Sequence, residues 1–410
     1  MITNILLGLL LFEVFLLLII NWLKNDFQWL ITNKDEKIIF NKRDLDKFII
    51  QGYDSHLGWK RKENSSKFEI IKGVGEHVNV SQNSEYNINA YSARLNFEHE
   101  KYDTKIITFG DSYSFCRHVN DNQTWQWYLS KSTQTNVENY GVGGYGIDQA
   151  LQLFNQKCKN LNRETKVSIM MVVPETISRI VNIWKHYNEY GNTFGFKGRY
   201  IIDNNKLRWI HNPINNVDKY YKLDDYYHDI QKNDFCYRNK FLKDKICFPY
   251  TFSIIKTYKR NVRLIYHLLK RKILQIFKIR NEAEINKAWS HILEHNRRFS
   301  NDLYQNASIK NLLKLIILEY KNRALKMNIK PVLVMVPYLQ DITKNKIFYK
   351  DLLNEISDDL LTIDVNDLFS NKSNNKDFYI SEYYGSHLNS KGNYQVAEYL
   401  HEILVENHYI

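Results

Sequence analysis

Short apolar runs separated by longer helical stretches are the feature that most constrains the fold of this chain. Four such runs follow residue 104, and "QTNVENYG" adds a weaker fifth: "TKIITFG" (104–110), "QTNVENYG" (134–141), "KVSIMMVV" (166–173), "KPVLVMVPY" (330–338) and "LLTIDV" (360–365). Continuous apolar runs of this length are typical of parallel strands covered on both faces. We therefore predict an α/β fold with a doubly wound parallel sheet of about five strands, whose sites lie at the carboxyl ends of the strands.

Three polar, glycine-containing segments lie next to these predicted strands. They are Gly110-Asp111-Ser112, then "NYGVGGYG" (139–146), and "GSHLNSKGN" (385–393) before the last predicted helix. A serine after aspartate at a strand-to-helix junction is commonly only a helix cap, and glycines in a tight turn can serve packing alone. Each segment by itself is therefore weak evidence for a site.

In this order, however, the three segments resemble the SGNH (GDSL-like) hydrolase superfamily, over roughly residues 100–185 and 328–405. The first segment resembles the nucleophile block, with Ser112 as the serine. "NYGVGGYGIDQ" resembles the glycine block, in which the amide of Gly144 serves the oxyanion hole. "HLNSKGN" resembles the histidine block, with His387 as the base. The resemblance implies a three-layer α/β domain and acyl-ester chemistry.

The chemistry of these residue types agrees with that resemblance. A serine hydroxyl becomes a good nucleophile when an imidazole removes its proton, and the unperturbed pKa of histidine, about 6.5, suits this task near neutrality. Backbone amides of Ser112 and Gly144 can stabilise the negative oxygen of the intermediate without reorganisation. We therefore expect Ser112 and His387 to be catalytic.

Two positions depart from the family pattern. The family usually places an aspartate three or two residues before the histidine, where this chain has Tyr384 and Gly385. The orienting role then passes to Glu382, to a backbone carbonyl or to no side chain, which leaves a Ser-His dyad. The asparagine that completes the oxyanion hole is also missing, and Thr176 in "PETISR" is the nearest candidate donor.

The segment "ILLGLLLFEVFLLLIINWL" (5–23) is apolar apart from Glu13 and Asn21. At about 1.5 Å per residue it spans the hydrocarbon core of a bilayer, which is roughly 30 Å thick. No basic residue precedes it and no small-residue cleavage signal follows, so a retained anchor at 1–24 is favoured over a signal peptide. A buried or interfacial helix of a soluble protein is the alternative. Glu13 is costly in mid-bilayer unless a partner helix relieves it.

The remaining chain divides into two further regions. Residues 25–100 are expected to be an N-terminal extension of short strands and loops on the core, without an evident function. The catalytic domain covers 101–410, with a helical insertion at about 197–325. Within the insertion, 251–280 carries nine Lys or Arg and no acid, and much of the net charge of +12. Its apolar residues recur every three or four positions: Ile254, Tyr258, Val262, Ile265, Leu269, Ile273 and Ile276. This pattern predicts an amphipathic helix, lying either on an anionic membrane or on the protein with a solvated basic face.

The resemblance implies an esterase or deacetylase acting on an acylated cell-envelope glycan or another small ester. The alternatives are an O-acyltransferase and a non-catalytic glycan-binding relative. An exported domain is only slightly favoured, because Lys and Arg after the anchor favour the cytoplasmic side. No cofactor, metal or nucleic acid is expected, since the cysteines lack metal-ligand spacing and no nucleic-acid-binding motif accompanies the charge. Aromatic residues could stack sugars or pack in the core: Trp184, Tyr187, Tyr190, Phe194, Phe196 and Tyr200.

Overall fold

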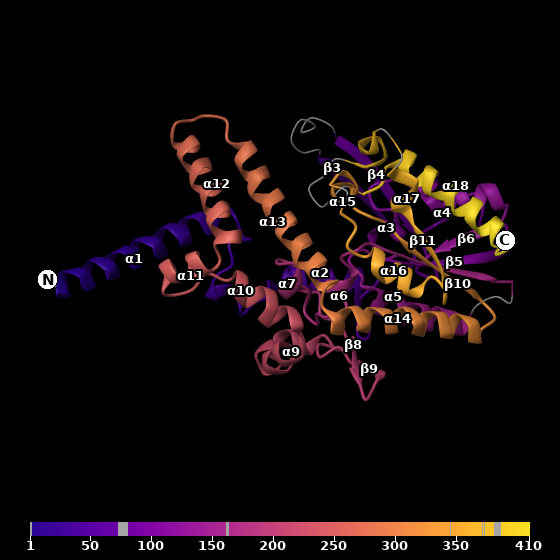
Figure 1. Cartoon of the computed structure of the whole chain (residues 1–410), viewed down its shortest axis with the longest axis horizontal. Coiled ribbons are helices and arrows are strands. Elements are labelled where there is room, and N and C mark those ends of the chain that lie inside the picture. Colours follow the sequence, from indigo (N-terminus) through magenta and orange to yellow (C-terminus); the bar gives the residue numbers. More distant parts are fainter. Residues whose placement is uncertain are drawn as a thin grey trace. The chain divides into compact units, whose positions relative to one another are not determined.

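The computed structural model describes residues 2–72, 81–160, 164–344, 346–370, 372, 374–380 and 387–410. They form two compact units, each built from segments that are far apart in the sequence (Figure 1). The first unit comprises Met1–Asp46, Asn182–Phe196 and Asn216–Phe299. The second unit comprises Lys47–Val181, Lys197–Asn215 and Ser300–Ile410.

A five-stranded parallel sheet forms the centre of the second unit, as the apolar runs predict. Its strands are β5 (Thr104–Gly110), β6 (Asn136–Asn139), β7 (Val167–Val172), β10 (Lys330–Met335) and β11 (Leu361–Asp364). They are arranged in the order β11-β10-β7-β5-β6, and every pair is parallel. The strand order reverses between β5 and β7, and ligands of doubly wound sheets bind at such a switch point.

Helices cover both faces of this sheet. On one face, α4 (Trp125–Thr133) and α18 (Ser390–Glu406) pack against the side chains of Val167, Ile169 and Met171. On the other, α14 (Ala307–Lys326) binds β7 through the hydroxyl of Tyr320, which donates to the carbonyl of Ser168 at 2.7 Å. Successive residues of β7 point to opposite faces, and the strand is buried throughout. The sheet is therefore the middle layer of three.

Shorter elements complete the second unit. Its other helices are α3 (Ser112–Phe115), α5 (Ile147–Lys157), α6 (Thr176–Arg179), α15 (Leu339–Thr343), α16 (Lys350–Ile356) and α17 (Val365–Phe369). The helix α2 (Lys42–Gly52) runs into it from the first unit. Three antiparallel hairpins are formed by β1 (Tyr53–Asp54) with β2 (Gly58–Trp59), β3 (Ser65–Lys72) with β4 (Ser81–Ile88), and β8 (Arg199–Asp203) with β9 (Lys206–Ile210).

The first unit is helical. Its helices are α1 (Ile2–Asp26), α7 (Lys185–Asn188), α8 (Asp218–Tyr221), α9 (Tyr227–Asn233), α10 (Leu242–Asp244), α11 (Tyr250–Lys256), α12 (Tyr258–Ile276) and most of α13 (Glu282–Leu303). Within α1, Thr3–Asp26 is long and apolar enough to cross a membrane, and most of its side chains are exposed. Near its end, Ile20 and Leu23 are buried, and together with Phe27, which follows the helix, they share a core with Leu264, Leu268 and Ile292.

Three sequence-based expectations differ from these units. The region 197–325 is not one block, because 197–215 and 300–325 group with the sheet while 182–196 groups with α1. The predicted helix at 251–280 is divided at Thr257 into α11 and α12. A sugar-stacking platform is wrong for Trp184, Tyr187 and Phe196, which are buried and pack on one another.

Candidate active site

Ser112 lies directly after the carboxyl end of β5, an inner strand of the sheet. The strand ends at Gly110, whose φ is +144° and whose side-chain position is filled by the carbonyl oxygen of Met171, 1.8 Å from a Cβ built there. Only glycine fits this backbone. The chain can therefore turn directly from β5 into α3, and Ser112 is the first residue of that helix.

Asp111, not Ser112, caps α3. One oxygen of its buried carboxylate accepts from the amide of Tyr113 at 2.9 Å, and the other accepts from the amide of Val173 at 3.0 Å. The guanidinium of Arg179 lies 3.4 Å from the second oxygen. Burial raises the pKa of Asp111 above its usual range, although Arg179 and both amides act in the opposite direction. Asp111 thus ties the nucleophile turn to the end of β7, which leaves the hydroxyl of Ser112 for other partners.

His387 meets Ser112 from the far end of the sequence. Its Nε2 lies 2.8 Å from the Oγ of Ser112, and its side chain is buried. The rings of Tyr113 and His118 flank the imidazole, with centroids 4.9 and 5.0 Å away. The carbonyl of His387 accepts from the amide of Ile380 at 2.8 Å, which fixes the turn before α18. An Nε2 that accepts the serine proton requires the ring hydrogen on Nδ1.

The glycine-rich turn after β6 lies beside Ser112. The amide of Val142 donates to the carbonyl of Gly110 at 3.0 Å, which extends the contact between β5 and β6 beyond the strands. Gly144 has φ +77°, a value that favours glycine. A Cβ built on Gly143 would lie 3.9 Å from the Cβ of Ser112. The structure therefore brings Ser112, His387 and this turn together.

The other two candidate residues are placed differently. The hydroxyl oxygen of Thr176 is buried and accepts from the amide of Ile147 at 2.8 Å, so it joins α6 to the start of α5. Its part in an oxyanion hole stays a prediction. Glu382 lies outside the described residues, as do Tyr384 and Gly385.

Sequence reasoning missed Arg61, which follows β2 in the segment for which no function was expected. The guanidinium of Arg61 stacks on the ring of Phe115, 3.7 Å from its centroid, and its Nη2 lies 3.5 Å from a Cβ built on Gly143. The indole of Trp59 donates to the carbonyl of Gly143 at 3.1 Å and holds this segment against the glycine turn. The sequence around this single arginine does not indicate that it lies beside Phe115 and Gly143.

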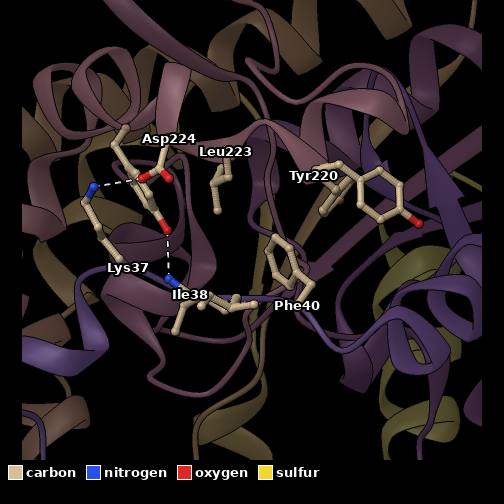
Figure 2. A pocket seen from close by; sticks show the side chains of 9 residues that line it. Lys37, Ile38, Phe40, Tyr220, Leu223 and Asp224 are labelled. Atoms are coloured by element: carbon tan, nitrogen blue, oxygen red, sulfur yellow. Dashed lines mark hydrogen bonds and ion pairs between the residues drawn. The ribbon is translucent and has the colours of Figure 1, made fainter.

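A pocket of about 320 Å³ lies in the first unit, away from these residues in the chain (Figure 2). Its rim carries an exposed ion pair between Lys37 and Asp224, and the amide of Ile38 donates to the hydroxyl of Tyr227. Phe40 and Leu223 contribute apolar surface. Among the residues that the structure describes, no group of three or more His, Cys, Asp or Glu comes together as a metal site.

Fold and site together define a doubly wound α/β domain with a serine–histidine pair at its topological switch point. No protein-family model and no curated protein matches the chain. Among solved structures, the chain is similar to a protein from Desulfitobacterium hafniense DCB-2 that is described as a lipolytic protein of the G-D-S-L family. The TM-score is 0.34 and the sequence identity is 13%, and the match covers 74% of this chain and 100% of that one. The interpretation of the site therefore depends on its own geometry.

Proposed function

We propose that the protein is a serine-dependent carboxyl-ester hydrolase. The observation that carries the proposal is the 2.8 Å contact between Ser112 Oγ and His387 Nε2 at the switch point of the sheet. In the first step, Ser112 Oγ attacks the ester carbonyl and its proton passes to His387. His387 then gives this proton to the leaving alcohol oxygen, and an acyl-serine remains. Water, deprotonated by His387, attacks the acyl-serine and releases the carboxylic acid and the serine.

The negative oxygen of each tetrahedral intermediate would lie against the amides of Ser112 and Gly144. The positive φ of Gly144 and the extended pairing of the turn with Gly110 hold that amide in a fixed position. A fixed donor stabilises such an oxygen without reorganisation, and loss of one donor typically costs about 3 kcal/mol of barrier. We assign the orientation of His387 to Glu382 or to a backbone carbonyl of the preceding residues.

We further propose that α1 is a retained membrane anchor and that the substrate is an acylated cell-envelope glycan on the outer side. Support for retention comes from Leu23 and Phe27, which are buried in the core of the first unit. Cleavage after α1 would remove Leu23 and expose Leu264 and Leu268. An anchored enzyme acts on esters near a membrane, and acylated glycans of the envelope are such esters.

The test is covalent labelling of the full-length protein in detergent with a serine-reactive fluorophosphonate. Wild type should be labelled on Ser112, the Ser112→Ala variant should not, and His387→Gln should be labelled far more slowly. Ser114→Ala is the matched control, because this neighbouring serine is buried and should not react. Absence of label on wild type, or equal label on Ser112→Ala, would favour a non-catalytic glycan-binding protein. Transfer of a radiolabelled acetyl group to a glycan hydroxyl in preference to water would make the enzyme an acyltransferase.

A further inference from the structure

Arg61 is a cation at the edge of the candidate active site that pairs with no acidic residue among those the structure describes. Within the part of the chain that the structure describes, it forms no salt bridge, and its buried Nε has no hydrogen-bond partner. The neighbouring cations differ in this respect: Arg94 binds Asp121 at 2.7 Å, and Arg117 binds Glu69 at 2.6 Å. Arg61 is partly buried and its Nε is fully buried, and a cation so placed beside a nucleophile, with no described acid as its partner, is suited to bind an anion.

The surroundings keep Arg61 charged but poorly compensated. Burial lowers the pKa of its guanidinium to about 10, and the positive charges of Arg94 and Arg117 act in the same direction. At neutral pH the group still carries its proton. A negatively charged ligand would offset both the cost of burying this charge and its repulsion from Arg94 and Arg117.

Arg61 and Ser112 both lie next to Gly143. A methyl group on Gly143 would lie 3.5 Å from Arg61 Nη2 and 3.9 Å from the Cβ of Ser112. The guanidinium and the serine therefore border the same small region beside Gly143. Arg61 itself is held in position by stacking on Phe115 and by the bond of nearby Trp59 to Gly143.

We infer that Arg61 binds a carboxylate or phosphate group of the ester substrate, so that the substrate class is negatively charged esters. This inference rests on the proposed function, because it assumes that the ester binds at Ser112. A guanidinium presents paired donors that match the geometry of both anions.

The inference is tested by comparing the hydrolysis of two esters that share a leaving group, with full-length protein solubilised in detergent. Wild type should hydrolyse mono-4-nitrophenyl succinate with a kcat/KM about tenfold above that for 4-nitrophenyl acetate, as expected for one charge-assisted contact. Arg61→Met should bring this ratio to about one by lowering kcat/KM for the succinate ester about tenfold more than that for the acetate, and Arg61→Lys should retain part of the preference. Lys62→Met, the exposed neighbour, is the control. An equal loss on both esters, or no preference in wild type, would overturn the inference.

A binding measurement separates this inference from the hydrolase proposal. Calorimetry with inorganic phosphate and with succinate on Ser112→Ala needs no turnover. Binding to Ser112→Ala that is lost in Ser112→Ala/Arg61→Met supports the anion site even when no ester is hydrolysed. Equal binding by both variants, at an equal thermal unfolding midpoint, contradicts it.

A second inference follows independently from the exposed apolar face of α11 and α12. On α12 the side chains of Leu264 and Leu268 pack into the core of the first unit, while another set points outward. This set continues onto α11, is 47 to 68% exposed and recurs at intervals of three, four or seven residues: Phe252, Ile255, Tyr258, Val262, Tyr266, Ile273 and Ile276. A water-exposed helix does not normally present an apolar stripe of this length.

A contact with α1 places the start of α11 beside the apolar stretch of that helix. The carboxylate of Glu13, near the middle of the apolar stretch, accepts from the amide of Thr251 at 3.0 Å and also from the amide of Tyr250. The start of α11 is therefore beside the middle of α1, in the same apolar layer. This contact supplies the partner that Glu13 requires there.

The exposed positive charges of α11, α12 and the residues after them favour a surface of anionic lipid as the partner of this face. Four exposed cations border the apolar stripe, Lys256, Lys259, Arg263 and Lys278, and none forms a salt bridge with a described residue. Cations beside an apolar stripe bind anionic headgroups while the stripe enters the acyl boundary. We infer that α11 and α12 lie in the same leaflet as the adjoining part of α1 and bind anionic lipid.

The full chain in vesicles that contain a diazirine phospholipid tests this inference. Mass spectrometry should find lipid crosslinks on peptides from 248–278 as well as on 5–22, with a several-fold higher yield when phosphatidylglycerol is added to phosphatidylcholine. Replacing Lys256, Lys259 and Arg263 by serine should abolish that increase. The exposed Tyr394 and Val405 of α18 are the internal control. Crosslinks on 5–22 alone would overturn the inference.

Discussion

Gly110 and Gly143 of the candidate active site differ in the room that each leaves for the methyl group of an alanine. Their alanine variants therefore form a matched pair. At Gly110 a Cβ would lie 1.8 Å from a backbone oxygen, at a φ of +144°. At Gly143 the nearest atoms are 3.5 and 3.9 Å away, which is ordinary contact. We expect Gly110→Ala to lower the free energy of unfolding by about 3 kcal/mol or more. Gly143→Ala should fold normally but lose turnover, because its methyl group occupies the region between Arg61 and Ser112.

Urea unfolding and ester hydrolysis, both in detergent, check this pair. A fully active Gly143→Ala protein would show that substrate does not enter the region beside Gly143. An unchanged midpoint for Gly110→Ala would contradict the close approach of β5 and β7 at that position.

The lowered pKa of Glu69 in β3 should make the free energy of unfolding depend on pH in the acidic range. Burial by itself would raise the pKa of Glu69, but the hydrogen bond and charge of Arg117, with a further bond from Tyr86, lower it to about 2. Because the folded-state pKa is below the ordinary value of 4.5, the stabilisation is complete above pH 4.5 and is lost as the pH falls towards 2. It amounts to about 3 kcal/mol at most.

Urea unfolding of wild type and Glu69→Gln between pH 7 and pH 2.5 measures this contribution. The variant should be less stable at pH 7, and the difference between the two proteins should shrink below pH 4.5. Parallel pH profiles would contradict the assignment to Glu69.

At the scale of elements, the cap of α18 positions His387. The side-chain oxygen of Asn389 accepts from the amide of Gly392 at 2.9 Å, and its Nδ2 donates to the carbonyl of Asp377 at 2.8 Å. Asn389→Ala should cost about 1 kcal/mol of stability, the usual value of such a cap. It should also lower kcat roughly tenfold, because small displacements of a catalytic group are costly.

Asn306 caps α14 in the same way, accepting from the amide of Ile309 at 3.1 Å, and serves as the control. Asn306→Ala should lose similar stability without a change in kcat beyond the loss of folded protein. Equal kcat values for the two variants would mean that the cap of α18 does not hold His387.

The strands and the motif-bearing turns could be predicted because their signals are local. Each apolar run became a strand within a few residues, and Ser112 and His387 are 2.8 Å apart although 275 positions separate them. Arg61 could not be predicted, since its position depends on stacking against Phe115 and on the turn at Gly143. The periodicity of 251–280 indicated an amphipathic helix, but which face packs depends on Ile20 and Leu23 of a distant helix.

At the scale of the whole molecule, α1 is long and apolar enough to cross a membrane, and its end also belongs to the fold of the first unit. Its first two-thirds exposes apolar side chains, whereas Leu23 is fully buried with Leu264 and Leu268. Removal of a buried leucine side chain typically costs about 2–5 kcal/mol. Leu23→Ala should therefore destabilise the first unit, whereas Leu10→Ala, at an exposed position of the same helix, should not.

Two buried thiols report separately on the two units. Cys236 lies in the first unit and Cys116 in the second, and neither is in a disulfide. In micelles, Leu23→Ala should increase the rate at which a maleimide modifies Cys236 by at least about 30-fold, the factor that corresponds to 2 kcal/mol, because local opening precedes modification. The rate at Cys116 should stay constant, and Leu10→Ala should change neither rate. If both thiols respond equally to Leu23→Ala, the two units unfold as one; if neither responds, Leu23 does not stabilise the first unit and the argument for retention of α1 fails.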